Sequence, residues 1–207
     1  MSLRCAVFAS GGGSNFQALL DRRKSGDLHA EFVLMVGNNS RAGAFEKARS
    51  SGIPVLHAAP SHFPDEGSYV QALSNALKEV KTELIVLAGY MKMLPSGIVQ
   101  EYHNRIVNIH PGLLPAFGGK GMYGMHVHQA VLDYGAKLSG VTVHFVDEEY
   151  DHGPVILQKA VPVLDTDTPV VLAARVLQAE HDNYWRAVEA IAQGKITVEG
   201  RRVRGDV

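Results

Sequence analysis

The chain has 207 residues, enough for one domain with a sizeable core or for two small ones. Hydrophobic residues make up 46% and charged residues 20%, which is the composition of an ordinary globular protein. The 20 basic and 21 acidic residues give a formal net charge of -1, which argues against a protein that mainly binds nucleic acid. The single cysteine, Cys5, excludes an internal disulfide and favours a reducing compartment, here expected to be the cytoplasm.

No sequence feature predicts a membrane segment or a second domain. No apolar run reaches the length of a membrane span, and the first ten residues lead into a strand-like run without the features of a signal peptide. No repeat or linker rich in Pro, Ser and Gly divides the chain. We therefore expect one domain over residues 1–207.

In the first half, short apolar runs alternate with amphipathic stretches. The runs are continuous, as expected for parallel strands covered on both faces, and comprise Cys5–Phe8, Phe32–Val36, Pro54–Leu56, Leu84–Ala88 and Ile106–Ile109. Between them, apolar residues recur with helical spacing, at Phe16, Leu19 and Leu20 and again at Tyr69, Leu73, Leu77 and Val80. This order predicts an α/β fold, with a single doubly wound, mostly parallel sheet and helices on both faces.

The second half has a different pattern. Two longer strand candidates, Leu138–Phe145 and Val155–Pro162, are separated by a polar loop, which suggests one antiparallel strand. Thr168 as N-cap and Pro169 at the first helical position predict a final helix through about Ala192. The charged tail from Lys195 onward is expected to lie on the surface or to fray.

A glycine-rich turn, Ser10-Gly-Gly-Gly-Ser-Asn15, follows the first strand and opens a helix. Backbone N–H groups at such a helix start suit a phosphate. The dinucleotide fingerprint would need glycine where Phe16 stands, and the nucleotide P-loop would need Gly-Lys-Ser/Thr at the helix entry. The turn therefore predicts a cradle for a monophosphate, with a plain turn capped by Ser14 or Asn15 as the alternative.

The fourth strand is expected beside the first, so that their carboxyl ends form a crevice for ligands. It is followed by Gly89-Tyr-Met-Lys-Met-Leu94, in which apolar side chains and one cation suit a flat heteroaromatic ligand with an anionic tail. Ordinary core packing of these residues is the alternative.

The fifth strand ends in Asn108-Ile-His-Pro-Gly-Leu-Leu-Pro115. Residues two apart on a strand face the same way, so Asn108 and His110 share one side. An amide donor beside an imidazole is suited to acyl transfer, which needs a stabilised oxyanion and a proton or positive charge. A structural histidine at a strand end is the alternative.

The loop Asp147-Glu-Glu-Tyr-Asp-His-Gly-Pro154 carries four carboxylates within five positions. Asp151, before the Gly-Pro turn, is the best candidate to reach His110, raise its pKa and keep the imidazole charged at working pH. A solvated acidic turn is the alternative, and Asp147, Glu148 or Glu149 is the next choice of partner.

Four segments together resemble the glycinamide ribonucleotide formyltransferases, folate-dependent enzymes of purine biosynthesis. They are Ser10–Asn15, Ala88–Leu94, Asn108–Pro115 and Val143–Gln158, and they occur in the family's order over nearly the whole chain. The Asn-x-His-Pro-x-Leu-Leu-Pro core is shared by a wider formyltransferase superfamily, whereas the Gly-Ser-Asn loop and the chain length favour this member.

The resemblance implies a Rossmann-like formyltransferase domain that passes the formyl group of 10-formyltetrahydrofolate directly to the amine of glycinamide ribonucleotide, through a tetrahedral intermediate and without a metal. Its catalytic residues would be Asn108, His110 and Asp151. Its substrate-binding residues would be Gly13, Ser14 and Asn15 for the phosphate and Glu180 for the ribose. Its folate-binding residues would be Met91, Lys92, Met93, Leu94, Asn108, Asp147, Glu148, Glu149, Tyr150 and Asp151. We expect no nucleic acid or membrane partner, and a homodimer is the candidate assembly.

Three departures from the family pattern stand out. Gly112 replaces a common serine, the stretch 117–124 is unusually rich in glycine, and Glu66 stands where some members carry an arginine that faces the site. Lys92 or Lys120 is the candidate replacement for that arginine.

Parts of the sequence pattern also fit four other kinds of protein. Methionyl-tRNA formyltransferase would need a further C-terminal domain and a basic surface, and formyltetrahydrofolate deformylase would need a further N-terminal domain. A metal hydrolase would use His126 and His128 with His144 or His152. A non-catalytic folate- or nucleotide-binding module would keep the pocket without needing His110.

Overall fold

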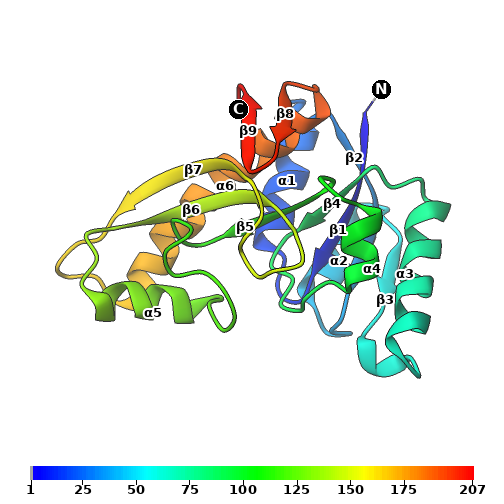
Figure 1. The fold of residues 1–207 in the computed structure, drawn as a ribbon, viewed down its shortest axis with the longest axis horizontal. Helices are drawn as coiled ribbons and strands as arrows, with labels where there is room; N and C mark the ends of the chain where they lie inside the picture. The colour runs from blue at the N-terminus through cyan, green and yellow to red at the C-terminus, as the bar shows by residue number, and fades with distance from the viewer. Residues whose placement is uncertain (1) are drawn as a thin grey trace. The chain divides into compact units, whose positions relative to one another are not determined.

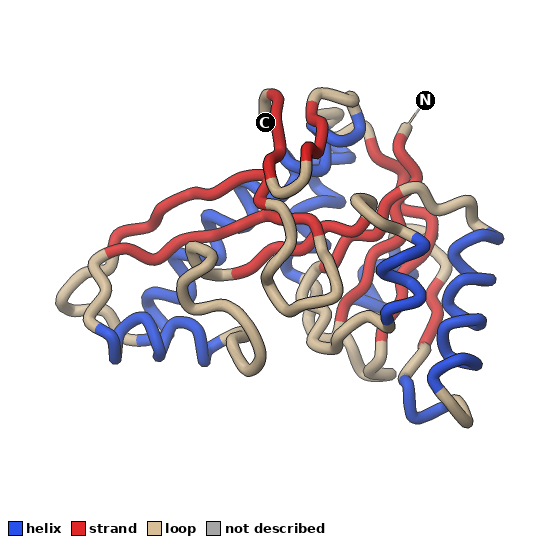
Figure 2. Tube along the Cα trace, in the orientation of Figure 1, coloured by secondary structure: helices blue, strands red, loops and turns tan. Residues whose placement is uncertain are grey.

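The computed structural model describes residues 2–207. The chain divides into two compact units, one that ends at Val107 and one from Asn108 to Val207. Figure 2 shows the helices and strands of the chain, which alternate in the first unit, whereas the second also has consecutive strands. No helix within residues 2–207 is both long and apolar enough to cross a bilayer.

The first unit contains alternating strands and helices. Its strands are β1 (Leu3–Ala9), β2 (Ala30–Gly37), β3 (Val55–His57), β4 (Leu84–Leu87) and β5 (Ile106–His110), the last of which crosses the unit boundary. Its helices are α1 (Ser14–Ser25), α2 (Gly43–Ser50), α3 (Glu66–Glu79) and α4 (Ser96–Glu101), with a short 3-10 turn at Pro60–His62.

The central strand of this unit is β1, which pairs in parallel with β2 on one side and with β4 on the other. Residues Cys5–Ala9 of β1 are fully buried, which explains why this run is continuously apolar. The predicted neighbourhood of the first and fourth strands is confirmed. The segments after β1 and β4 therefore leave the same edge of the unit, where ligands bind in folds of this kind.

The second unit is built on a long antiparallel pair, β6 (Leu138–Phe145) and β7 (Val155–Pro162). Its helices are α5 (Met125–Tyr134) and α6 (Pro169–Ala192), and Figure 1 shows α6 running along the strand pair. Thr168 Oγ1 accepts a hydrogen bond from Val171 N–H, so the predicted cap of α6 is confirmed. Valine and leucine side chains of α5, α6, β6 and β7 form a buried cluster: Val127, Val131, Val141, Val161, Leu172 and Val176.

Of the two expectations for the tail, its place on the surface is confirmed and fraying is wrong. Residues after Lys195 form a hairpin of β8 (Ile196–Glu199) and β9 (Arg202–Gly205), and β9 pairs in parallel with the start of β7 at Val155. In this segment valines and an isoleucine alternate with polar and charged residues, which is the pattern of a β-strand. The many charged residues made this pattern hard to recognise in the sequence. The hydrogen-bonded order of the described strands is β3-β2-β1-β4-β5-β6-β7-β9-β8, a mostly parallel sheet as predicted.

We expect Gly140→Ala to destabilise the fold by about 1–3 kcal/mol, because an added methyl group overpacks β6 against β7. A Cβ at this position would collide with the carbonyl oxygen of Lys159 and lie 2.7 Å from Leu113 Cδ2. Denaturant titration measures the free energy of unfolding. Gly11→Ala is the control, since a Cβ there meets no atom within 4 Å; equal stability of the two variants would contradict the described strand packing.

Candidate active site

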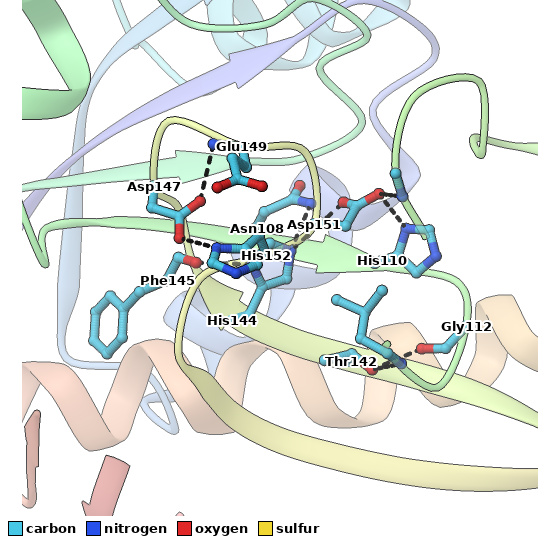
Figure 3. Close-up of polar contacts among 12 residues, drawn as sticks. Asn108, His110, Gly112, Thr142, His144, Phe145, Asp147, Glu149, Asp151 and His152 are labelled. Carbon is cyan, nitrogen blue, oxygen red and sulfur yellow. Dashed lines mark hydrogen bonds and ion pairs between the residues drawn. The ribbon is translucent and has the colours of Figure 1, made fainter. Parts of the chain in front are cut away.

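The carboxylate of Asp151 lies between two buried imidazoles in the second unit (Figure 3). Its Oδ2 is 3.5 Å from His110 Nδ1, and its Oδ1 is 3.7 Å from His144 Nε2. Oδ2 also accepts a hydrogen bond of 2.9 Å from Gly119 N–H. The structure therefore places Asp151 beside His110, as the sequence predicted.

Local backbone conformation explains how these groups meet. His110 is the last residue of β5, and Asp151 lies in the loop between β6 and β7 with a φ of 54°. Asp is among the few residues that enter this left-handed region at modest cost, because its short polar side chain tolerates it. That conformation belongs to the turn that carries the Asp151 carboxylate toward the histidines.

The glycine-rich segment after Pro115 wraps around His110. The carbonyl oxygen of Phe117 lies 2.9 Å from His110 Nε2, so this nitrogen carries the proton that the carbonyl accepts. A Cβ at Gly118 would collide with Leu114 Cδ2 and lie 3.2 Å from Asp151 Cβ. The absence of a side chain at Gly118 therefore allows this glycine-rich segment to pass close to both His110 and Asp151.

Gly112, the departure from the family pattern, also lies against His110. A Cβ at position 112 would be 3.1 Å from His110 Nε2 and 3.2 Å from Cδ2. The absence of a side chain there leaves the His110 ring room in its present position.

Burial lowers the pKa of His110 below its usual value of 6.5, and this effect outweighs the opposing effects of the Asp151 carboxylate and the Phe117 carbonyl. The ring is only 3% exposed. Burial thus disfavours the charged form of His110 in the free protein, while the Asp151 carboxylate shifts the pKa in the expected direction, upward. That Asp151 keeps the imidazole charged at working pH stays a prediction, which burial opposes, because sequence spacing revealed the carboxylate but not the depth of burial.

Asn108 contacts a residue that sequence analysis considered only as a metal ligand. Its Nδ2 lies 3.2 Å from Nε2 of His144, whose Nδ1 lies 2.8 Å from the carbonyl oxygen of Phe145. Burial lowers the pKa of His144 from its usual value, and the Phe145 carbonyl and the Asp151 carboxylate only partly oppose this.

Thr142, two residues before His144, holds the turn that follows His110. Its hydroxyl donates to the carbonyl oxygen of Gly112 at 2.7 Å and accepts from Leu114 N–H at 3.1 Å. Gln158 Nε2 donates to the same hydroxyl at 3.0 Å. Sequence analysis missed this role, although polar residues two apart in an apolar strand were a usable signal, because they share one face.

The other acidic side chains of the loop 147–153 either form hydrogen bonds within the loop or are exposed. Asp147 accepts from His152 Nδ1 at 2.7 Å and from Glu149 N–H at 3.0 Å. Arg201 of the C-terminal hairpin donates to the His152 carbonyl oxygen at 2.6 Å. The remaining predicted folate residues of this loop, Glu148, Glu149 and Tyr150, are exposed.

In the first unit, Ser10 connects the glycine-rich turn with the segment after β4. Its N–H donates to the Gly89 carbonyl oxygen at 3.0 Å, and its hydroxyl accepts from Met91 N–H at 2.9 Å. The hydroxyl donates in turn to Asn38 Oδ1. The two segments expected to hold ligands are thus joined by one serine.

The helix after the glycine-rich turn begins at Ser14, and its N-cap is Gly13 with a φ of 71°. The alternative in which Ser14 or Asn15 caps this helix is therefore wrong. A glycine cap offers no side-chain oxygen to the first N–H groups of the helix, which suits them to an external anion.

The other predicted ligand residues differ in exposure. Met91 and Met93 are about half exposed and Lys92 is exposed, whereas Leu94 is buried. Core packing therefore accounts for Leu94 but not for the two methionines. Glu180 lies in α6 and is buried.

The histidines of the alternative metal site do not gather. Within residues 2–207, no three His, Cys, Asp or Glu side chains are grouped as metal ligands. His126 is exposed and His128 is buried on α5.

Comparison with known proteins extends this picture. The family described as formyl transferase matches residues 3–188. Two chloroplastic phosphoribosylglycinamide formyltransferases are similar over 93% of this chain, at 45% identity in Vigna unguiculata and 47% in Arabidopsis thaliana. The chain spans 62% and 66% of the length of these relatives, respectively.

Among solved structures, glycinamide ribonucleotide transformylase 1 from Symbiobacterium toebii superposes with a TM-score of 0.92 at 39% identity, covering 99% of this chain and 94% of that one. The predicted family and fold are confirmed. This chain belongs to the formyl transferase family, and within it to the phosphoribosylglycinamide formyltransferases.

Proposed function

We propose that this protein transfers the formyl group of 10-formyltetrahydrofolate to the primary amine of glycinamide ribonucleotide. The observation that carries the proposal is that, in a chain of this family, the Asp151 carboxylate lies beside the His110 imidazole, which shares one face of β5 with the Asn108 amide. An amide donor and an imidazole paired with a carboxylate are the groups that acyl transfer needs.

The partners of His110 are both acceptors: the Phe117 carbonyl at Nε2 and the Asp151 carboxylate at Nδ1. This geometry suits the doubly protonated ring, while burial opposes its charge. Attack of the amine on the formyl carbon places negative charge on the formyl oxygen. We infer that Asn108 donates a hydrogen bond to this oxygen, and that the negative charge favours uptake of a solvent proton at His110 Nδ1, which is released again when the formyl C=O bond re-forms.

The attacking nitrogen must also lose a proton before the bond between the formyl carbon and N10 of the folate breaks. Asp151 accepts this proton in the proposed mechanism, directly or through a water, and N10 leaves with a proton in exchange. In the proposed mechanism, Asn108 is the hydrogen-bond donor to the formyl oxygen. His110 becomes positively charged as the reaction proceeds, and Asp151 is the base.

The substrate contacts in this proposal come from the remaining predicted residues. The glycine cap of α1, with Ser14 and Asn15, holds the substrate phosphate, and Glu180 holds the ribose hydroxyls. The proposed folate contacts are the segment Met91–Leu94 of the first unit, whose exposed methionines offer an apolar surface to a flat ring, and the loop Asp147–Asp151 of the second.

An absorbance assay of formyl transfer with glycinamide ribonucleotide as acceptor tests the proposal. Folate turnover that depends on the acceptor supports it. Release of formate without acceptor would instead favour the deformylase alternative, and ligand binding without turnover would favour a binding module. A single domain, a cytoplasmic location, a homodimer and the lack of nucleic-acid partners stay predictions.

Asn108→Ala should lower kcat by about 10²–10³-fold, the usual loss when one well-placed oxyanion donor is removed. Steady-state kinetics measures the change, with circular dichroism to verify the fold. Turnover equal to wild type would show that Asn108 is only a strand-end residue.

Asp151→Asn should lower both kcat and the pKa of His110. Removing an anion destabilises the nearby cation, so the pKa, already lowered by burial, must fall further. Asparagine tolerates the left-handed conformation of position 151, so the loop is retained. NMR titration of the ring protons measures the pKa.

The control for this experiment is Glu149→Gln, which removes the charge of an exposed acid from the same loop. It should leave the His110 pKa in place. A pKa that rises or stays constant in Asp151→Asn would exclude Asp151 as the partner of His110.

Gly13→Val should weaken glycinamide ribonucleotide binding while folate binding is retained. A Cβ at Gly13 would lie 2.8 Å from Ala44 Cβ, and the positive φ disfavours a branched residue, so the turn must shift away from its anion-binding shape. Gly12→Ala is the control, because a Cβ there meets no atom within 4 Å. Calorimetry that shows equal loss of both ligands would refute the phosphate assignment.

A further inference from the structure

His144 is a buried imidazole on β6 that the proposed chemistry does not use. Its side chain is 2% exposed; Nδ1 faces one polar group, and Nε2 faces a second at hydrogen-bond distance and, at 3.7 Å, the Oδ1 of Asp151. The first group is the carbonyl oxygen of the next residue, Phe145, and the second is the side-chain amide of Asn108 (Figure 3).

The two contacts together fix where the His144 proton lies. A carbonyl oxygen only accepts, so Nδ1, at 2.8 Å from the Phe145 oxygen, must carry the proton. Nε2 of the neutral ring then has a free lone pair and only accepts. It therefore accepts from Asn108 Nδ2–H at 3.2 Å, and the amide is held with its nitrogen toward the ring.

The charged surroundings of His144 are consistent with a neutral ring. Burial lowers the pKa of His144 and outweighs the Phe145 carbonyl and the carboxylates of Asp151 and Asp147, which favour the charged ring. A protonated Nε2 would face the Asn108 NH2 group, donor against donor, and the amide would turn over. The neutral ring is thus the form that holds the amide in its present orientation.

We propose that His144 is a positioning residue that fixes the orientation of the Asn108 amide, so that the second N–H of this amide remains available to an oxyanion. This inference rests on the proposed formyl transfer for its effect on rate, but the orientation itself does not depend on that activity. The donor is then organised before substrate binds, which is the condition under which such groups accelerate acyl transfer.

Two substitutions separate the contacts of His144. His144→Asn keeps an N–H donor near the position of Nδ1 but ends short of Asn108, whereas His144→Gln extends an amide oxygen toward the position of Nε2. We expect kcat to fall in His144→Asn with little change in KM, by no more than the loss of about 10²–10³-fold expected when the donor itself is removed, and to fall less in His144→Gln. A role confined to stability would lower both variants alike and would not give this order.

A double-mutant cycle tests whether His144 acts through Asn108. In the Asn108→Ala background, His144→Asn should cause no further loss of kcat, because the amide that it orients is gone. Fully additive losses would overturn the proposal.

The tautomer is read directly by imidazole ¹⁵N NMR of the wild-type protein at pH 7. We expect a neutral His144 with its proton on Nδ1, and either a charged ring or a proton on Nε2 would overturn the proposal. This measurement needs neither turnover nor a folded variant. If the wild-type protein fails to transfer formyl groups while the tautomer is as expected, the proposed function fails and the orientation of Asn108 by His144 stands.

Discussion

The shared carboxylate of Asp151 is the interaction on which the second unit's site depends. Its two oxygens face two imidazoles and one backbone N–H, while only 12% of the side chain is exposed. A carboxylate shielded from water in this way needs hydrogen-bond donors, and the N–H of Gly119 supplies one at 2.9 Å. The left-handed backbone of Asp151 and the close passage of Gly118 and Gly119 both serve that requirement, because each brings a polar group to the carboxylate without a side chain in the way.

Burial and the charge of the Asp151 carboxylate shift the pKa values of His110 and His144 in opposite directions. The pKa values of His110, His128 and His144 are all lowered, in each case chiefly by removal from water. In the proposed mechanism, imidazoles whose charge is disfavoured at rest form their strongest electrostatic contacts only when charge appears on the reacting atoms. Such contacts stabilise the transition state more than the bound substrates, and they therefore raise the rate rather than the affinity alone.

Sequence alone predicted the fold closely, because the strands of this sheet are continuous apolar runs or clear alternations. The bounds of β6, β7 and α6 agree with the structure, whereas the β8–β9 hairpin was missed because its charge hid a strand period. The neighbourhood of Asp151 and His110 was also predictable from the motifs. The lowered pKa of His110 and the contact between His144 and Asn108 could not be predicted from the sequence. Both depend on burial and on the distance between side chains of different strands.

The hydrogen bonds of Ser10 have a thermodynamic consequence for the first unit. One serine binds the carbonyl of Gly89, the N–H of Met91 and the side chain of Asn38, so the turn after β1 and the segment after β4 share a partner. A ligand on one segment that displaces Ser10 changes the free energy of the other. Thermodynamic linkage requires such an effect to be equal in both directions. The two ligands proposed for these segments would therefore change each other's dissociation constants by the same factor, whichever binds first.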